Sequence, residues 1–274
     1  DLGEDALRVV TKLARQTDPE DTNARQVVIF YDNAQDIYGR GSPRWSTFGL
    51  DMRGRSSVMK ESFRSTRPIA EFALNALQTL TPLDRDPDIR ELIAMGLLEA
   101  RQRDGQLWWQ VHFNEVRGPA PGATWHRHRH GELDALTARI CGWIEQGVAP
   151  ADIAVLVNKK VIGEQVVTNA RTRLHALGAR ITFQSGGRFE VAEDLVRVST
   201  IHSFKGYDAE IVALPCVESY CSQGRALPRN FYVGATRARS ILHVSGSEQF
   251  ADKAGLAVLE AVKATVERQL GHDD

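Results

Sequence analysis

The sequence lacks the features that mark several classes of protein. Its three cysteines form neither a C-x-x-C pair nor an even disulfide set, a pattern typical of a reducing compartment rather than of a disulfide scaffold. No apolar run approaches the length of a membrane span, and the N-terminus has no signal-peptide core. We therefore expect a cytoplasmic protein that has no membrane partner and whose thiols fill its core.

An excess of charge is absent as well. The 34 basic and 35 acidic residues give a formal net charge of −1, so any contact with nucleic acid has to come from a local patch. The 274 residues, 42% of them hydrophobic, are enough to bury the core of one large domain, or of one domain and a piece of another.

Short apolar runs alternate with helical patterns, which predicts an α/β domain around a mostly parallel sheet flanked by helices. Strands are expected at residues 26–32, near 58, and at 106–116, 153–157, 180–183, 195–201, 210–214 and 240–244. Helices are expected at residues 4–15, 65–80, 92–100, 132–144, 166–177, 230–238 and 249–270. Ligands of such folds sit beyond the carboxyl ends of the strands, where we expect the loop that follows Thr200.

Two clusters of chemically useful residues stand in the first quarter of the chain. In "YDNAQDIYGR", residues 31–40, the amide of Gln35 can both donate to and accept from a phosphate or its water, and Tyr38 offers a ring to a base. In "KESFRST", residues 60–66, Phe63 adjoins Arg64, whose guanidinium suits a bidentate grip on phosphate. Taken singly, Gln35 is an ordinary loop residue and Arg64 a surface arginine paired with a glutamate.

Two further clusters stand near the C-terminus. In "VSTIHSFKGYDAEIVAL", residues 198–214, Gly206 permits a tight turn or the close approach of a ligand, and Asp208 can accept hydrogen bonds from sugar hydroxyls. A solvated turn is the alternative interpretation. In "RNFYVGATRARSILHVSG", residues 229–246, Arg237 lies near the end of a short predicted helix, where it could reach a transferring phosphoryl group.

In this order and spacing, the four clusters resemble the third to sixth motifs of superfamily 1 helicases of the UvrD/Rep type. The similarity runs from the N-terminus to about Val244, and the fifth and sixth motifs are its most specific part. It implies that residues 1–52 are the C-terminal remnant of a first RecA-like domain. Residues 53–274 would be the second RecA-like domain, without the family's large accessory insertion.

The resemblance implies three groups of site residues. Those acting on the γ-phosphate would be Gln35, Arg64 and Arg237. Those at the adenine and the ribose side of the nucleotide would be Phe63, Gly206 and Asp208, the last where the family usually has Glu. Those facing the nucleic-acid strand would be Tyr38, Thr200 and His202.

Two family motifs are missing from the chain. It has no G-x-x-x-x-G-K-[ST] phosphate loop and no D-E-x-[QD] acidic motif, both of which precede the third motif in the family. The resemblance therefore predicts the C-terminal portion of a longer protein, inactive by itself. ATP and Mg²⁺ would be held mainly outside this chain. The partners would be single-stranded DNA, with RNA as the alternative, and the first RecA-like domain of the same polypeptide.

The function implied is that of an ATP-dependent helicase, which couples hydrolysis to translocation on single-stranded DNA and to unwinding. The alternatives are a translocase that remodels complexes without unwinding, and a degenerate helicase domain that serves as an interaction module. No metal site is predicted: we interpret "WHRHRH", residues 125–130, as an exposed loop. Of Trp108 and Trp109, at least one is expected to be structural rather than base-stacking.

Overall fold

The computed structural model describes residues 4–18, 20, 26–29, 45–50, 64–83, 87–186 and 190–271. The chain divides into two compact units, residues 1–60 and 61–274. The domain boundary predicted after residue 52 lies in the stretch 51–63, outside the described residues.

The first unit contains helix α1 (Glu4–Leu13) and the short 3₁₀ helix η2 (Trp45–Phe48). Leu7, Phe48 and Leu50 form its small buried cluster. The strand predicted at 26–32 is wrong in its described part, because residues 26–29 form no strand and Val28 is 81% exposed. An apolar run becomes a strand only when a neighbouring strand satisfies its backbone groups.

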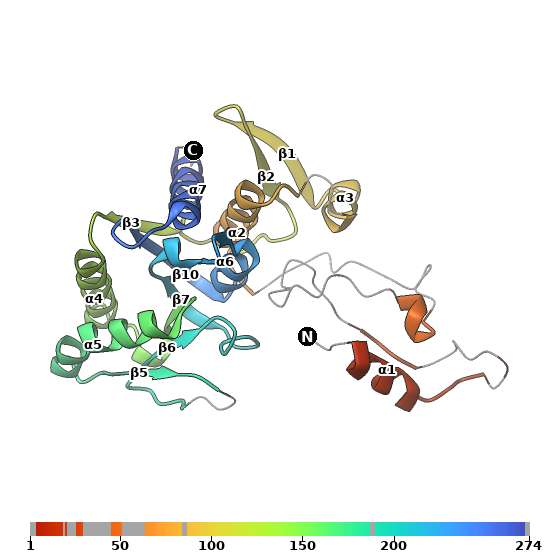
Figure 1. The fold of residues 1–274 in the computed structure, drawn as a ribbon, viewed down its shortest axis with the longest axis horizontal. Coiled ribbons are helices and arrows are strands. Elements are labelled where there is room, and N and C mark those ends of the chain that lie inside the picture. Colours follow the sequence, from red (N-terminus) through yellow and green to blue (C-terminus); the bar gives the residue numbers. More distant parts are fainter. Residues whose placement is uncertain are drawn as a thin grey trace. The chain divides into compact units, whose positions relative to one another are not determined.

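The second unit is built on a six-stranded sheet whose strands are all parallel (Figure 1). In spatial order the strands are β3 (Gly122–His126), β10 (Ala238–Ser247), β7 (Ala209–Leu214), β4 (Ile153–Val157), β6 (Leu195–Thr200) and β5 (Arg180–Gln184). The predicted fold class, an α/β domain with a parallel sheet, is confirmed, and the arrangement is consistent with a RecA-like domain.

Helices cover both faces of this sheet. Helices α4 (Arg129–Glu145) and α5 (Lys160–Ala176) pack on the face to which Ile153, Val155 and Val157 contribute. On the other face lie α2 (Arg67–Leu80) and α6 (Pro228–Ala235), while α7 (Lys253–Leu270) packs beside α2. Because both faces are covered, the central strand β4 is buried along its whole length, as its unbroken apolar run predicts.

The largest departure from the predicted elements lies between α2 and β3. Helix α3 (Pro87–Ala94) is followed by an antiparallel hairpin of β1 (Leu98–Arg103) and β2 (Gln106–Val111). The helix predicted at 92–100 is therefore wrong beyond Ala94. Gly96 adopts a φ of +70°, which ends the helix, and the ladder with β2 holds the following residues in a strand.

The structure confirms one other sequence interpretation and corrects another. Trp108 and Trp109 are 0% and 3% exposed, so at least one is structural, as expected, and neither presents a ring to a base. The stretch 125–130 is not an exposed loop throughout, because it includes the end of edge strand β3 and the start of α4.

The short elements are η3 (Pro150–Asp152), η4 (Val217–Ser219), β8 (Cys221–Ser222) and β9 (Arg225–Ala226). None of the helices described has the length and apolar character needed to cross a membrane.

Candidate functional site

Asp208 is contacted by two arginines that are far from each other in the sequence. Its Oδ2 lies 3.4 Å from Nε of Arg64, and its Oδ1 lies 3.5 Å from Nη1 of Arg237. Nη1 of Arg237 also donates to the carbonyl oxygen of Tyr207 at 3.5 Å. Three of the residues singled out in the sequence therefore form one cluster, which we call the arginine–aspartate cluster.

Strand pairing alone brings Asp208 and Arg237 together. Asp208 directly precedes β7 and Arg237 directly precedes β10, and these strands are parallel neighbours with Ala209 opposite Ala238. The amide of Ala209 donates to the carbonyl oxygen of Arg237 at 3.1 Å, which closes the ladder at this point. The two side chains consequently leave the sheet at the same edge.

Arg64 reaches this edge from a different direction. The chain just before α2 runs beside the start of β10, where the amide of Thr66 donates to the carbonyl oxygen of Arg239 at 3.0 Å. The Arg64 side chain is 44% exposed, whereas that of Arg237 is 3% exposed. Arg64 is thus the solvent-facing guanidinium of the cluster, and Arg237 the enclosed one.

The predicted site residues lie at both edges of the sheet, and not only at the carboxyl ends of the strands. Asp208 and Arg237 stand at the amino ends of β7 and β10, whereas Thr200, the last residue of β6, stands at the opposite edge. The connection 201–208 has to cross the sheet because β6 and β7 are parallel. The motif after Thr200 therefore begins at one edge and ends at the other.

Gly206 lies on this connection with a φ of +92°. A Cβ atom at this position would meet no atom within 4 Å, so it is the backbone conformation that favours glycine, not lack of space. The glycine turns the chain towards the start of β7 and so delivers Asp208 to the arginines.

Thr200 and His202, the residues expected to face nucleic acid, are together at the carboxyl edge of β6. The hydroxyl of Thr200 is 3.0 Å from that of Ser203 and accepts from the Ser203 amide at 3.3 Å, so it caps the turn that follows. His202 reaches the surface. Partial burial of the ring, which removes water from it, and then the charge of Lys205 lower the pKa of His202, which favours the neutral imidazole at pH 7.

The other predicted site residues are not part of the described structure. Gln35, Tyr38 and Phe63 all lie outside the described residues, so their roles stay predictions. Of the nine residues, Arg64, Asp208 and Arg237 form one group, and Thr200 and His202 form a second at the other edge of the sheet.

The charge of the arginine–aspartate cluster suits an anion. Two guanidinium groups face one carboxylate, which leaves a local net positive charge, and guanidinium is the group best matched to phosphate oxygens. Beside it, Arg239 lies 3.8 Å from Glu210, which also accepts a hydrogen bond from Ser240. Because Asp208 is engaged by both arginines, the cluster fits a nucleotide phosphate better than it fits Mg²⁺.

A second polar cluster, in the core, was missed by sequence reasoning. Glu132, Cys216 and Glu218 are the one group of described residues placed closely enough to share a metal ion. Arg129 lies against them, with Nη2 2.7 Å from Oε1 of Glu218, while Glu132 accepts from the Cys216 amide at 2.7 Å and the Ser245 hydroxyl at 2.8 Å. Burial, and then the nearby Glu132, raise the pKa of Glu218. These bonds explain the group as a tie between α4, η4 and β10.

Comparison with known proteins yields similarities of fold. No protein-family model and no curated protein matches the sequence. The C-terminal domain of a possible DNA helicase from Lactobacillus plantarum WCFS1 aligns over 73% of this chain and 96% of its own, with 15% identity and a TM-score of 0.46. An arterivirus nonstructural protein 10 helicase, solved in complex with DNA, aligns over 60% of this chain and 44% of its own, with 9% identity and a TM-score of 0.35. Identities and TM-scores this low assign no function to the chain.

Proposed function

We propose that this chain carries the second motor domain of an ATP-dependent superfamily 1 helicase of the UvrD/Rep type. The observation that supports this most directly is the arginine–aspartate cluster. Arg64, Asp208 and Arg237 come from three of the four motifs that the resemblance assigns to the nucleotide, and they meet at one edge of the sheet. A chance resemblance of short motifs gives no reason for their side chains to converge.

In this proposal the two arginines act on the phosphates of ATP. ATP, bound with Mg²⁺ mainly by a preceding RecA-like domain, supplies the phosphoryl group that is transferred to water. Arg64 and Arg237 exchange the carboxylate of Asp208 for phosphate oxygens, which also accept bidentate hydrogen bonds from guanidinium. Both remain charged throughout, so they stabilise the negative charge of the transition state, a contribution of about 10³- to 10⁵-fold for an arginine finger.

Asp208 has two roles in the same proposal. Without nucleotide it neutralises one guanidinium charge and holds both arginines at the edge of the sheet. When the arginines bind phosphate, the carboxylate oxygens of Asp208 are released and can accept hydrogen bonds from a sugar hydroxyl. An aspartate at this place, one methylene shorter than the family's usual glutamate, keeps its carboxylate close to the strand and within reach of Arg237.

The connection 201–208 would couple the nucleotide to the nucleic acid. It begins with His202 at one edge of the sheet and ends with Asp208 at the other. Between them Phe204 is fully buried, and the guanidinium of Arg197 lies 5.5 Å from its ring centre. A connection packed this firmly moves as a unit, so a change at Asp208 alters how Thr200 and His202 meet a single strand of DNA.

A translocase that remodels complexes without unwinding is the second candidate. In the described residues between Arg64 and His202, the additions to the sheet and its helices are α3 and the β1–β2 hairpin, with no separate accessory domain. A small addition of this kind favours movement along one strand over separation of two. A strand-displacement assay on the intact protein decides between these candidates.

ATP hydrolysis by the intact protein, with and without single-stranded DNA or RNA, tests the proposed function. We expect Arg237→Ala to lower the stimulated turnover by about 100-fold or more, because a transition-state charge partner is lost. Arg64→Ala repeats the test at a side chain that is 44% exposed, where folding is at little risk.

Arg239→Ala is the matched control. Arg239 lies two residues from Arg237, but its side chain is 62% exposed and pairs with Glu210 instead of Asp208. Its loss should change turnover only a few-fold. Near-normal hydrolysis by Arg237→Ala and Arg64→Ala would overturn the proposal, and absence of hydrolysis in the unmodified protein would favour the interaction module.

A further inference from the structure

The chain that leaves the β1–β2 hairpin holds the segment next to Arg64. We call residues 112–118 the clamp segment. Within it, Asn114 is 2% exposed, its amide nitrogen donates to the carbonyl oxygen of Ser65, and its amide oxygen accepts from the Val116 amide at 2.9 Å. The carbonyl oxygen of Val116 accepts from the Arg67 amide at 2.7 Å. The backbone on both sides of Thr66 is therefore bonded to the clamp segment.

Gly118 brings the clamp segment against the side chain of Thr66. A Cβ atom at Gly118 would lie 2.4 Å from Cγ2 and 2.8 Å from Cβ of Thr66, which is closer than real Cβ contacts allow. On its other side Thr66 is bonded to β10, because its amide donates to the carbonyl oxygen of Arg239. The residues that carry Arg64 are held between the clamp segment and the start of β10.

This arrangement links the two arginines of the candidate site. Arg64 stands two residues before Thr66, and Arg237 stands two residues before Arg239. The hydrogen bond between Thr66 and Arg239 therefore joins the two backbone segments that bear these arginines. The clamp segment, bonded to Ser65 and Arg67, keeps the first of these segments against the start of β10. Where Arg64 lies relative to Arg237 and Asp208 thus depends on contacts made by Asn114 and Gly118.

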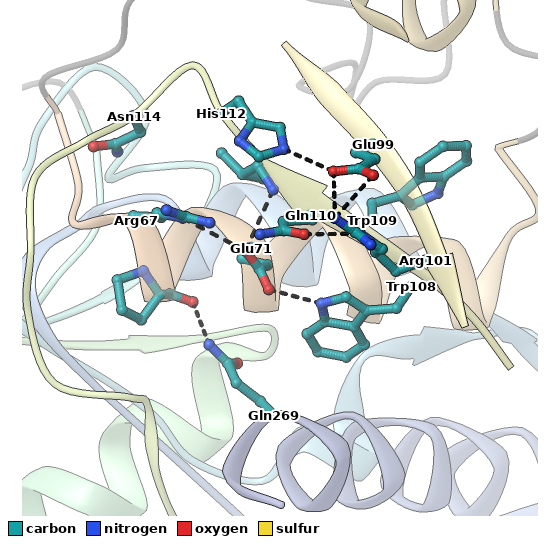
Figure 2. A network of polar contacts seen from close by, with 12 residues as sticks. Arg67, Glu71, Glu99, Arg101, Trp108, Trp109, Gln110, His112, Asn114 and Gln269 are labelled. Atoms are coloured by element: carbon teal, nitrogen blue, oxygen red, sulfur yellow. Dashed lines mark hydrogen bonds and ion pairs between the residues drawn. The ribbon is translucent and has the colours of Figure 1, made fainter. Parts of the chain in front are cut away.

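The β1–β2 hairpin, which directly precedes the clamp segment, is hydrogen-bonded to α2 (Figure 2). The carboxylate of Glu71 on α2 accepts from the indole nitrogen of Trp108 at 2.7 Å and from the Val111 amide at 3.3 Å. Asn75, one helical turn further on, donates to the carbonyl oxygen of Trp109 at 2.9 Å and accepts from its amide at 2.7 Å. These bonds hold the hairpin on α2. Glu71 also forms an ion pair with Arg67, with Nε 3.9 Å from Oε2, whereas the bonds of Asn75 do not involve residues 64–67.

We propose that Asn114 is a positioning residue for the nucleotide reaction: together with Gly118, it holds residues 65–67 against β10 and so sets Arg64 in register with Arg237. This inference rests on the proposed function. Asn114 lies outside every motif of the resemblance, and it acts through the backbone of Ser65 rather than on the nucleotide.

The substitution Asn114→Asp, compared with Asn75→Asp, tests the inference. At Asn114 the change replaces the donor to the Ser65 carbonyl with an oxygen and leaves two acceptors facing each other. Asn75 is also 2% exposed, and the same change there turns a donor to the Trp109 carbonyl into an acceptor. Because the Asn75 amide nitrogen also donates to the carbonyl oxygen of Glu71 at 2.8 Å, Asn75→Asp should lose at least as much stability in a thermal melt as Asn114→Asp. A larger loss of turnover in Asn114→Asp therefore reports on the position of Arg64.

In the intact protein we expect Asn114→Asp to lower kcat about tenfold or more with KM for ATP nearly unchanged, because a misplaced group weakens the transition state more than binding. Asn75→Asp should keep kcat within about twofold of the unmodified protein, since Asn75 is bonded to Glu71 and Trp109 and not to the segments that bear Arg64 and Arg237. On an Arg64→Ala background, Asn114→Asp should cause no further loss.

Amide hydrogen exchange of Thr66 and Arg67 provides a second readout that needs no hydrolysis. Asn114→Asp should speed exchange at both amides, whereas Asn75→Asp should leave them protected. If Asn114→Asp does not fold, Gly118→Ala takes its place, because the added methyl displaces Thr66 from the other side.

The outcomes separate this inference from the proposed function. Unchanged exchange at Thr66 and Arg67 overturns the clamp whatever the enzyme does. Faster exchange with normal turnover, in a protein that Arg64→Ala inactivates, overturns the positioning role alone. Absence of turnover in the unmodified protein overturns the proposed function and with it the positioning role, while exchange still decides whether Asn114 holds residues 65–67.

Discussion

At the scale of single residues, burial strongly affects the ionisation of His243. It lies on β10, is 3% exposed, and has Nε2 3.3 Å from the hydroxyl of Thr124. Burial, and then the charges of Arg139 and His126, lower the pKa of His243 to about 4. The imidazole is therefore neutral in the folded protein at all ordinary pH values.

We predict that His243 makes the protein less stable in mild acid. Because the unfolded state takes up the proton near pH 6.5 and the folded state only near pH 4, stability is lost as the pH falls between these values. The loss should reach about 3 kcal/mol at the lower end. Urea unfolding at several pH values measures it.

His243→Gln should flatten the pH dependence in this range, while the same change at the exposed His128 should not. Glu218 acts in the opposite sense, since its raised pKa makes its folded form bind a proton more readily as the pH falls. The comparison between variants cancels that contribution. An unchanged slope in His243→Gln would contradict the assignment.

At the scale of elements, two helical glycines show that packing neighbours decide whether a side chain larger than hydrogen fits. Gly142 lies in α4, and a Cβ there would meet no atom within 4 Å. Gly255 lies in the first turn of α7, and a Cβ there would be 2.6 Å from the backbone oxygen of Glu218. Helix propensity alone would favour alanine at both places.

We predict opposite effects of the same substitution at these glycines. Gly142→Ala should stabilise the protein by about 0.5 to 1 kcal/mol, because it lowers the backbone entropy of the unfolded chain. Gly255→Ala should destabilise it by about 1 to 3 kcal/mol, because the methyl pushes η4 away from α7. Chemical denaturation of both variants measures the difference, and two changes of the same sign would refute the explanation.

Elements with a clear hydrophobic pattern were predictable from the sequence, and elements that form only by pairing with another segment were not. The run 153–157 predicts β4 with its observed bounds, since an unbroken apolar run is what a strand buried on both faces requires. The start of β1 was predicted as helix, because Leu98 and Ala100 are compatible with either period until β2 supplies a partner. Asn114 was missed because an isolated asparagine has no pattern.

At the scale of the whole molecule, the described residues of the two units differ in how much core they contain. Residues 61–274 hold the six-stranded sheet with helices on both faces, whereas the first unit has a buried cluster of Leu7, Phe48 and Leu50. A chain of about 60 residues buries a smaller share of its surface and is only marginally stable by itself.

We therefore predict that residues 61–274, produced alone, fold and unfold cooperatively. Their melting temperature should stay within a few degrees of that of the longer chain, because the core of the sheet lies entirely inside them. Residues 1–60 alone should show no cooperative transition. Calorimetry of both fragments tests this, and a broad, non-cooperative melt of 61–274 would contradict it.

The sequence by itself determined the class of fold and singled out Arg64, Asp208 and Arg237 as candidate site residues. Apolar runs and turns are local properties, and they predict one strand shortly after Asp208 and another shortly after Arg237, whichever way those strands then pair. What tertiary structure decided is the edge at which the site forms, since parallel pairing of β7 with β10 joins their amino ends. It also decided that Asn114 touches Ser65, because contacts between residues far apart arise only once the chain has packed.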